Sequence, residues 1–519
     1  MFTSVKAPEG ARNTDLYEVT ISACGKKEIL PVYLALVSDG LGERPLPEQY
    51  RSVYTAVKTA TFVEKAYIAD FSADGEVDVR VEWKGDGTIK EIFGVTATIS
   101  GKVATFRMKP HDKVLLRPEG DTYRNHLCLS SSFPVKKPTA EKRIEFPAGN
   151  YTAANCPFIH KDAHGFDIID DIEDGTTVYI ARGAVIHAGF VLENKHAITL
   201  CGEGIIDTLD TSFGTDEGVF DEPLFLGALK DYTPSGIYIK TNSSDIKVEG
   251  LTLNGYFRGI TVRNSDDILV RGVKIFSGAV NADGISMVNV RRMRIEDCFI
   301  RTQDDTIAVF TSCDSILYLG DPECKNPIPL SEDIEVSHCT LFTACRNFCI
   351  GGHSTGSMNP RNILRNFYAH DIAAYSYRVY EKPDPARIQK WSGALRILSQ
   401  TEQDVSGIRF ENISFTERPE YTGKLIHIEV RSTGNASYTE RGGYRIRDVF
   451  FRNIVFSHKM GEGISRAIPS VILSDADSDA PDYGVFNVTM ENVTCGGIRM
   501  ENTAEFLTVA GHTENIVVK

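Results

Sequence analysis

The sequence predicts an all-β protein in which a parallel β-helix follows an N-terminal β-sandwich. Three observations predict this fold. Short runs with the two-residue alternation of strands recur along the chain, one such run returns at a regular spacing, and no helical period separates its copies. The 519 residues are also too many for one ordinary core, so an elongated repeat or a second domain is expected.

Residues 1–143 differ in texture from the rest of the chain. Alternating apolar and polar residues occupy 76–83, 95–99 and 102–108, and Gly/Asp turns join these runs. Such runs are typical of half-buried strands, and several of them without a helix favour an antiparallel sandwich. We therefore predict a β-sandwich domain over residues 1–143.

Residues 144–519 repeat one phrase, in which apolar-x-apolar-x is followed by Gly, Asn, Asp or His and then by apolar-x-apolar. The phrase begins at Asp245 and returns 22 residues later at Asp267. The next copy, at 293–300, follows after 25 residues. Later copies occupy 334–341, 408–415, 449–456 and 488–495, at steps of about 40 residues that allow for inserted loops. Two short strands around a bend, without the leucine frame of leucine-rich repeats, indicate a parallel β-helix over residues 144–519.

Composition excludes several classes of function. A net charge of −14 argues against a nucleic-acid partner, and no window is apolar enough to span a membrane. The first thirty residues are polar and lack the apolar core of a signal peptide, so we expect a cytoplasmic enzyme, or a secreted one if a leader precedes this sequence. The eleven scattered cysteines contain no CxxC pair and are interpreted as small core residues.

Three acids lie within apolar segments of the repeat. Asp304 and Asp305 follow Asp283 by 21 and 22 residues, which is one coil of the predicted solenoid. Residues one coil apart stack at about 4.8 Å, so the acids should gather on one face, and at least one of their pKa values should be raised. Adjacent strand residues point to opposite sides, so the chain must bend at Asp304–Asp305. Ordinary turn chemistry is the alternative interpretation.

Such a cluster has two chemical uses. Paired carboxylates can hydrolyse a glycosidic bond, one as the proton donor and the other as the base that activates a water molecule. Carboxylates can also bind Ca²⁺, as in a β-helix lyase that eliminates across a uronate. A non-catalytic carbohydrate-binding solenoid is a third possibility, but it leaves the cost of desolvating the acids unexplained.

The motifs Asn281-Ala282-Asp283-Gly284 and Gln303-Asp304-Asp305 resemble the Asn-Thr-Asp and Gln/Gly-Asp-Asp motifs of glycoside hydrolase family 28, the polygalacturonases. The sandwich before the β-helix resembles family 49, the dextranases and isopullulanase. The resemblance implies a right-handed β-helix of the pectin-lyase type and an O-glycosyl hydrolase that needs no cofactor. It also implies inversion by single displacement, with Asp304 as the general acid and with Asp283 and Asp305 activating water.

Other family motifs are altered here. Where family 28 has Gly-His-Gly, this chain places Arg346, and His353 is displaced by several residues. The family's Arg-Ile-Lys corresponds to Arg396-Ile397-Leu398, which lacks the lysine that would hold a substrate carboxylate. The sugar is therefore left open between an acidic and a neutral one, and Arg378 and Lys382 are candidates to compensate.

Aromatic residues in the inserts are suited to stacking on sugar rings: Tyr375, Tyr377, Tyr380 and Trp391, with Trp391 the favoured platform. The complete predicted substrate-binding set is Asn281, Gln303, Arg346, His353, Arg378, Lys382, Trp391 and Arg396. Long insertions between about residues 300 and 400 could close one end of the cleft and favour exo-attack. The expected partner is a carbohydrate substrate, and the oligomeric state is left open.

Overall fold

A computed structural model gives the structure of the chain. It describes residues 2–3, 9–10, 13–37, 65–119, 125–162, 165–208, 235–255, 258–277, 282–302, 304–311, 329–343, 345–352, 362–376, 393–399, 403–416, 423–431, 444–457, 459–460, 466–474, 482–501, 503 and 505–519. Every regular element within these ranges is a strand. The described residues accordingly include no helix long and apolar enough to cross a membrane.

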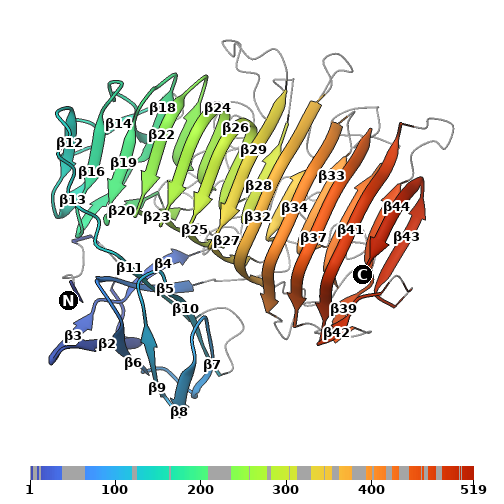
Figure 1. Cartoon of the computed structure of the whole chain (residues 1–519). Helices are drawn as coiled ribbons and strands as arrows, with labels where there is room; N and C mark the ends of the chain where they lie inside the picture. The colour runs from blue at the N-terminus through green and yellow to red at the C-terminus, as the bar shows by residue number, and fades with distance from the viewer. Residues whose placement is uncertain are drawn as a thin grey trace, which may run out of the picture.

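The solenoid is the parallel β-helix that the sequence predicts, and Figure 1 shows its strands stacked coil upon coil. The strand pairings arrange them in three faces. Face I contains β15 (Asp167–Ile169), β18 (Gly189–Glu193), β21 (Ser235–Lys240), the first parts of β24 (Arg258–Arg271) and β26 (Ile285–Glu296), then β28 (Ile307–Phe310), β31 (Phe348–Gly351), β33 (Leu395–Ser399), β36 (Ile426–Val430), β40 (Ser470–Ser474) and β43 (Leu507–Gly511).

Face II contains β12 (Arg143–Phe146), β16 (Thr177–Ile180), β19 (Thr199–Gly202), β22 (Ser244–Glu249), the second parts of β24 and β26, β29 (Leu330–Ser337), the first parts of β32 (Asn362–Ser376), β34 (Gln403–Thr416), β37 (Arg445–Phe456) and β41 (Gly484–Cys495), and finally β44 (Thr513–Val518). Face III contains β13 (Gly149–Tyr151), β17 (Ala184–Ile186), β20 (Ile205–Asp207), β23 (Thr252–Gly255), β25 (Lys274–Ser277), β27 (Phe299–Thr302), β30 (Thr340–Thr343) and the second parts of β32, β34, β37 and β41.

Five short strands complete the solenoid. They are β14 (His160–Lys161), β35 (Gly423–Lys424), β38 (Lys459–Met460), β39 (Arg466–Ile468) and β42 (Ile498–Arg499). Of these, β35, β38 and β39 form a small parallel sheet, whereas β14 and β42 each make an antiparallel pair with a solenoid strand.

The bend between faces II and III explains the repeated phrase in the sequence. Its polar residue has a positive φ in each copy, and these residues form what we call the bend ladder: Gly250, Gly272, Asp297, His338, Asp371, Asn412, Asn453 and Asn492. Only Gly, Asn, Asp and occasionally His adopt this left-handed conformation at low cost, which is why one of them occupies each of these bends. Side-chain amides also join the coils, because Asn453 donates to Asn412 over 3.0 Å and Asn492 donates to Asn453 over 2.8 Å.

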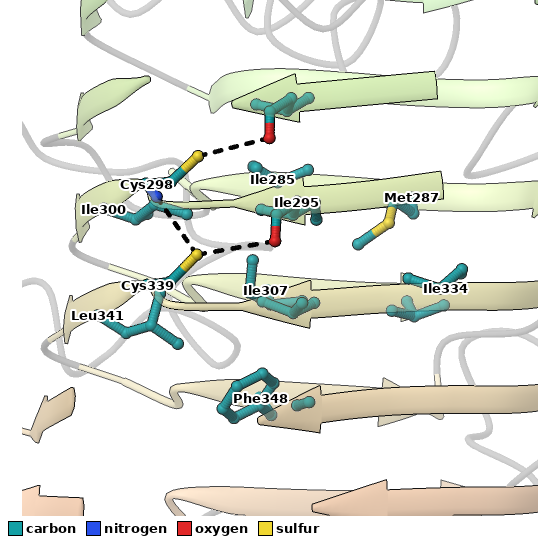
Figure 2. Packing of buried hydrophobic residues seen from close by; sticks show 14 of the residues in the cluster. Ile285, Met287, Ile295, Cys298, Ile300, Ile307, Ile334, Cys339, Leu341 and Phe348 are labelled. Carbon is teal, nitrogen blue, oxygen red and sulfur yellow. Dashed lines mark hydrogen bonds between the residues drawn. The ribbon is translucent and has the colours of Figure 1, made fainter. Parts of the chain in front are cut away.

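The core of the solenoid is a set of apolar columns. Ile285, Ile307 and Phe348 occupy equivalent positions in three successive coils and stack within the interior (Figure 2). Cys298 and Cys339 lie in the same core, where each thiol approaches a backbone carbonyl oxygen (Figure 2). All nine cysteines that the structure describes are free, and seven of them are buried, which confirms their interpretation as small core residues.

The N-terminal strands form the predicted sandwich. One sheet contains β1 (Phe2–Thr3), β4 (Tyr33–Val37), β5 (Lys65–Ala73), β7 (Ile89–Phe93), β10 (Lys113–Pro118) and β11 (His126–Ser132). The other contains β2 (Tyr17–Ala23), β3 (Lys26–Leu30), β6 (Val77–Trp83), β8 (Ala97–Ser100) and β9 (Val103–Met108). Alternate residues of β5, such as Tyr67 and Phe71, enter the core between the sheets, while Ala66 and Ile68 face the solenoid.

The first of these sheets packs against face III (Figure 1). Phe276, Phe299 and Phe342 of the solenoid share an apolar cluster with it, and Tyr375 joins them. Tyr375 is 5% exposed and lies 5.2 Å from the ring of Phe93, so its prediction as a sugar-stacking residue is wrong. The aromatic side chain is used instead to attach the sandwich to the solenoid. The domain boundary at residue 143 stays a prediction, and β12 begins there.

Candidate active site

The register of face I brings Asp283 and Asp305 together. Asp283 precedes β26 by two residues, Asp305 precedes β28 by two residues, and Ile285 pairs with Ile307. The Gly284 amide donates to the Asp305 carbonyl oxygen over 2.8 Å. The 22-residue spacing is therefore one full coil here, and Asp283 stacks on Asp305.

Two arginines continue this stack on either side. The Gly259 amide donates to the Asp283 carbonyl oxygen over 3.1 Å, and the Thr306 amide donates to the Arg346 carbonyl oxygen over 2.9 Å. Successive coils thus present Arg258, Asp283, Asp305 and Arg346, which we call the charge row. Arg258 Nε lies 3.3 Å from Asp283 Oδ2, and Arg346 Nε lies 2.7 Å from Asp305 Oδ1.

Asp304 occupies the bend that precedes the row. Its carbonyl oxygen accepts hydrogen bonds from the hydroxyls of Thr302 and Thr343, which hold the turn in place. Arg346 Nη2 lies 3.8 Å from Asp304 Oδ1. The Asp304 side chain is 22% exposed, compared with 9% for Asp283 and 5% for Asp305. Of the three acids, Asp304 is therefore the one best placed to meet a substrate.

Glycine is required at position 284, next to Asp283, because the neighbouring coil leaves no room for a side chain. A Cβ atom at this position would lie 2.3 Å from Ile300 Cγ2 and 2.6 Å from the Thr306 carbonyl oxygen. Contacts this short require the coil to shift, and the shift would separate the two stacked acids. The Asp-Gly pair of the sequence motif thus combines a carboxylate with a close approach between coils.

The acids of the charge row have opposite protonation tendencies. Burial, followed by the nearby charges of Asp304 and Asp305, raises the pKa of Asp283 to about 8, against an opposing effect of Arg258. Asp305 is equally desolvated, but the ion pair and hydrogen bond from Arg346 lower the pKa of Asp305 below its ordinary value. With Asp283 protonated and Asp305 paired with Arg346, neither of the two buried acids carries an uncompensated charge.

The same oxygens could in principle hold a cation, since Asp304, Asp305 and Cys345 offer ligand atoms within 4.8 Å of one another. Arg346 already contacts both carboxylates and supplies the positive charge that a dication would bring. Burial by itself would lower the pKa of the Arg346 guanidinium, but the charge of Asp305 outweighs burial and holds this pKa well above its ordinary value, so Arg346 remains a cation. These contacts favour acid–base chemistry over the calcium alternative.

Two further cations lie beyond Arg346. Arg396 is in β33 at the position next to Cys349, and it is fully buried. Lys424 of β35 occupies the same place in its coil as the members of the charge row, since Ile426 pairs with Leu395. Burial lowers the pKa of Arg396 to about 10 and that of Lys424 to about 8, with neighbouring positive charges contributing to both shifts.

The remaining predicted residues divide into two groups. Arg346 lies in the site, but as an ion-pair partner of the acids, and its role toward substrate stays a prediction, as does that of Arg396. Asn281, Gln303, His353, Arg378, Lys382 and Trp391 lie outside the described residues, as do Tyr377 and Tyr380.

Sequence reasoning missed Arg258 and Lys424. A signal for Arg258 was available, because Arg258-Gly259-Ile260 and Asp283-Gly284-Ile285 are matching triplets 25 residues apart. Matching them places an arginine directly before the first acid in the stack. Lys424 gives no comparable signal, since inserts separate its coil from the others.

Comparisons with known proteins agree with this architecture. Residues 197–494, which are 298 of the 519 residues, match the model of the glycosyl hydrolases family 28. The structure resembles Dex49A from Penicillium minioluteum with a TM-score of 0.60 and 13% identity, over 99% of this chain and 96% of that one. The family 28 exopolygalacturonase of Yersinia enterocolitica aligns with a TM-score of 0.43 and 12% identity, over 85% and 96% of the two chains. No curated protein sequence matches the chain.

Proposed function

This chain belongs to the glycosyl hydrolases family 28, and on that premise we propose that it is an inverting hydrolase that cleaves an oligo- or polysaccharide by exo-attack. The observation that carries the proposal is the charge row with Asp304 beside it. It supplies an accessible carboxyl group and a buried, ionised carboxylate, which are the proton donor and the base of a single displacement. Their oxygens approach within 4.8 Å, which is shorter than the roughly 6.5–9.5 Å usual for inverting pairs, so inversion is proposed from the family and not from this spacing.

Each acid has a separate task in the proposed reaction. Asp304 donates a proton to the glycosidic oxygen as the bond to the anomeric carbon breaks. Asp305, held ionised by Arg346, removes a proton from the water molecule whose oxygen attacks that carbon from the opposite side. Asp283 keeps its proton below about pH 8 and orients the same water molecule. The products are two sugars with free hydroxyls, and Asp304 and Asp305 return to their starting states by exchanging protons with solvent.

Arg396 and Lys424 favour a substrate that carries a carboxylate. Both cations are desolvated, and each has its pKa lowered partly by other cations nearby, although Glu429 opposes the shift at Lys424. A carboxylate bound beside them offsets the remaining repulsion. In this chain Leu398 stands where the family motif has a lysine. We propose that Lys424, one coil later, provides the positive charge of that lysine. A Lys424→Met variant should raise KM for uronate oligosaccharides and leave KM for neutral ones unchanged.

The direction of attack rests on the sequence alone. Residues 312–328, 353–361 and 377–392 separate the strands that carry the site from their successors, and insertions of this length support closure of one end of the cleft. Exo-attack releases one short product from the earliest time points, whereas endo-attack first releases a range of lengths.

One experiment tests substrate and stereochemistry together. The protein is incubated with pectic fragments, dextran, pullulan and small glycosides, and proton NMR records the first anomer released. We expect an inverted anomer from a uronate oligosaccharide and loss of nearly all activity in a folded Asp304→Asn variant. Hydrolysis that persists in this variant, or a retained anomer, would overturn the mechanism.

The lyase alternative gives a different result in the same assay. Elimination across a uronate produces an unsaturated sugar that absorbs in the ultraviolet and requires Ca²⁺. We expect no such absorbance and no effect of chelation on the rate, because Arg346 neutralises the carboxylates that a calcium ion would bind.

A further inference from the structure

One position of the bend ladder holds a histidine where later coils have an asparagine. In the later coils, asparagine amides pass hydrogen bonds from each bend to the one before it. His338 takes the equivalent bend position, with φ of 54°, between Asp297 and Asp371. Histidine adopts this conformation more readily than most residues, but it does not extend the chain of amides. Its presence therefore calls for a different explanation from that of the asparagines.

A second histidine lies beside it. His370 belongs to β32, where it is the neighbour of Ser337 across the ladder, and the ring centroids of His338 and His370 lie 5.8 Å apart. Asp371 follows His370 at the bend of the next coil. One ligand atom from each of His338, His370 and Asp371 lies within 4.8 Å of the other two. Two imidazoles and a carboxylate thus converge from consecutive coils.

The contacts of His370 fix how its ring can act. Glu335 Oε1 lies 3.0 Å from Nε2, Asp371 Oδ2 lies 2.7 Å from Nδ1, and the ring of Tyr368 stacks on the imidazole at 4.4 Å. Both ring nitrogens thus lie at hydrogen-bonding distance from a carboxylate. When Nδ1 loses its proton, its lone pair is directed toward Asp371 while Nε2 still donates to Glu335. A carboxylate behind a ligating imidazole is the arrangement that orients histidines in metal sites.

We propose that His338, His370 and Asp371 bind a divalent transition metal of the zinc class. Imidazole nitrogens with one carboxylate oxygen suit Zn²⁺, Co²⁺ or Ni²⁺ rather than Ca²⁺ or Mg²⁺, which take oxygen ligands. The metal replaces the proton between His370 Nδ1 and Asp371 Oδ2, and His338 supplies the third ligand. Water completes the coordination.

The surroundings make the site reachable and separate from the acids. His338 and Asp371 are exposed, and Glu335 and Tyr368 border a surface groove of about 520 Å³. The cluster lies at the bend between faces II and III, whereas the charge row lies on face I. A metal here links the coil of β29 to that of β32, so its effect is on the stability of these coils rather than on the hydrolytic step.

The test uses Zn²⁺ and Co²⁺ on the full chain after treatment with a chelator. Isothermal titration with ZnCl₂ should give one site per chain with a micromolar or lower Kd, and Zn²⁺ should raise Tm by several degrees. Co²⁺ should give the visible absorption of a site with nitrogen ligands. His338→Asn is the decisive variant, because Asn412 and Asn453 show that asparagine fits the same bend. It should fold, and it should lose the binding, the absorption and the Tm shift.

His160→Asn is the matched control, since this histidine is exposed and lies outside the cluster. It should bind Zn²⁺ as the parent protein does, and His370→Gln should behave like His338→Asn. The proposal is overturned if the parent protein binds no Zn²⁺ at micromolar concentration, or if folded His338→Asn keeps the same stoichiometry and affinity.

Discussion

The charge row and the bend ladder are both stacks of polar side chains repeated once per coil, yet they have opposite properties. In the bend ladder, Asn492 donates to Asn453, and Asn453 donates to Asn412. Each amide is both a donor and an acceptor, so the asparagine part of the ladder is neutral and can continue from coil to coil. In the charge row, an ionised carboxylate can accept hydrogen bonds but cannot donate them, so Asp283 and Asp305 cannot satisfy each other in this way. Each of them is flanked by an arginine instead.

This difference shows how one backbone spacing gives either stability or reactivity. Amides stacked about 4.8 Å apart satisfy one another, whereas two buried carboxylates at that spacing repel and cannot both ionise freely. The protein resolves the conflict by placing a proton on Asp283 and an ion pair on Asp305. Asp305 is thereby kept ionised, as a general base requires, while Asp283 beside it stays neutral.

The largest expected effect comes from replacing a carboxylate of the charge row with an amide like those of the bend ladder. Asp305→Asn keeps the shape of the side chain and removes the charge that activates water. We expect kcat to fall by about 10²- to 10⁴-fold, the usual contribution of a general base. Rates are measured on folded protein, as judged by circular dichroism and Tm. A loss smaller than tenfold would mean that Asp305 is not the base.

Removing the arginine partner should act on both stability and pH dependence. Arg346→Met leaves Asp305 buried without its ion pair, which we expect to cost about 3–5 kcal/mol in the free energy of unfolding. The pKa of Asp305 then rises, so the acidic limb of kcat/KM should move to higher pH. Denaturant unfolding and a pH–rate profile measure these effects. Arg107→Met, at a side chain that is 70% exposed, is the control and should change neither.

Asp283→Asn tests the raised pKa through stability. The folded protein keeps the Asp283 proton up to about pH 8, whereas the unfolded chain loses it near 3.8. Between these values the folded state binds more protons, so the stability of the parent protein falls as pH rises. Each unit of pKa difference corresponds to about 1.4 kcal/mol. The variant should therefore gain stability relative to the parent from pH 4 to pH 8, and a constant difference would contradict the assignment.

The smallest effect is expected from the reverse change, in which a carboxylate replaces an amide of the bend ladder. Asn453→Asp replaces the amide that donates to Asn412 and faces two oxygens toward each other at an exposed bend. We expect a loss of about 1 kcal/mol in unfolding free energy from one hydrogen bond, with kcat unchanged. A change in kcat of more than twofold would show that the two stacks are not independent.

Much of this architecture could be predicted from the sequence, for a physical reason. The bend residues Asp297, Asn412 and Asn453 interrupt the apolar alternation wherever the backbone needs a positive φ, so the coils can be counted directly. The spacing from Asp283 to Asp305 then places both acids in one stack. The sandwich follows in the same way from the alternation in β6 and β9.

Other features depend on parts of the chain that are far apart in sequence. The burial of Asp283 and Asp305 cannot be read from their neighbours in the chain, and neither can the difference in their pKa values. Tyr375 looked like a surface aromatic because the sequence does not show that the sandwich covers face III. The position of Lys424, which matches that of the charge row in a later coil, can be recognised only once the register of β33 and β36 is known.

The proposed mechanism depends most on different protonation states of Asp283 and Asp305, which lie one coil apart. Carbon-13 NMR of the aspartate carboxyl groups, assigned with Asp283→Asn and Asp305→Asn, measures both titrations in one protein. We predict that Asp305 stays ionised down to below pH 4 and that Asp283 titrates near pH 8. If both carboxyl groups instead titrate together near pH 4, the stacked acids are ordinary surface carboxylates and the proposed division of labour is wrong.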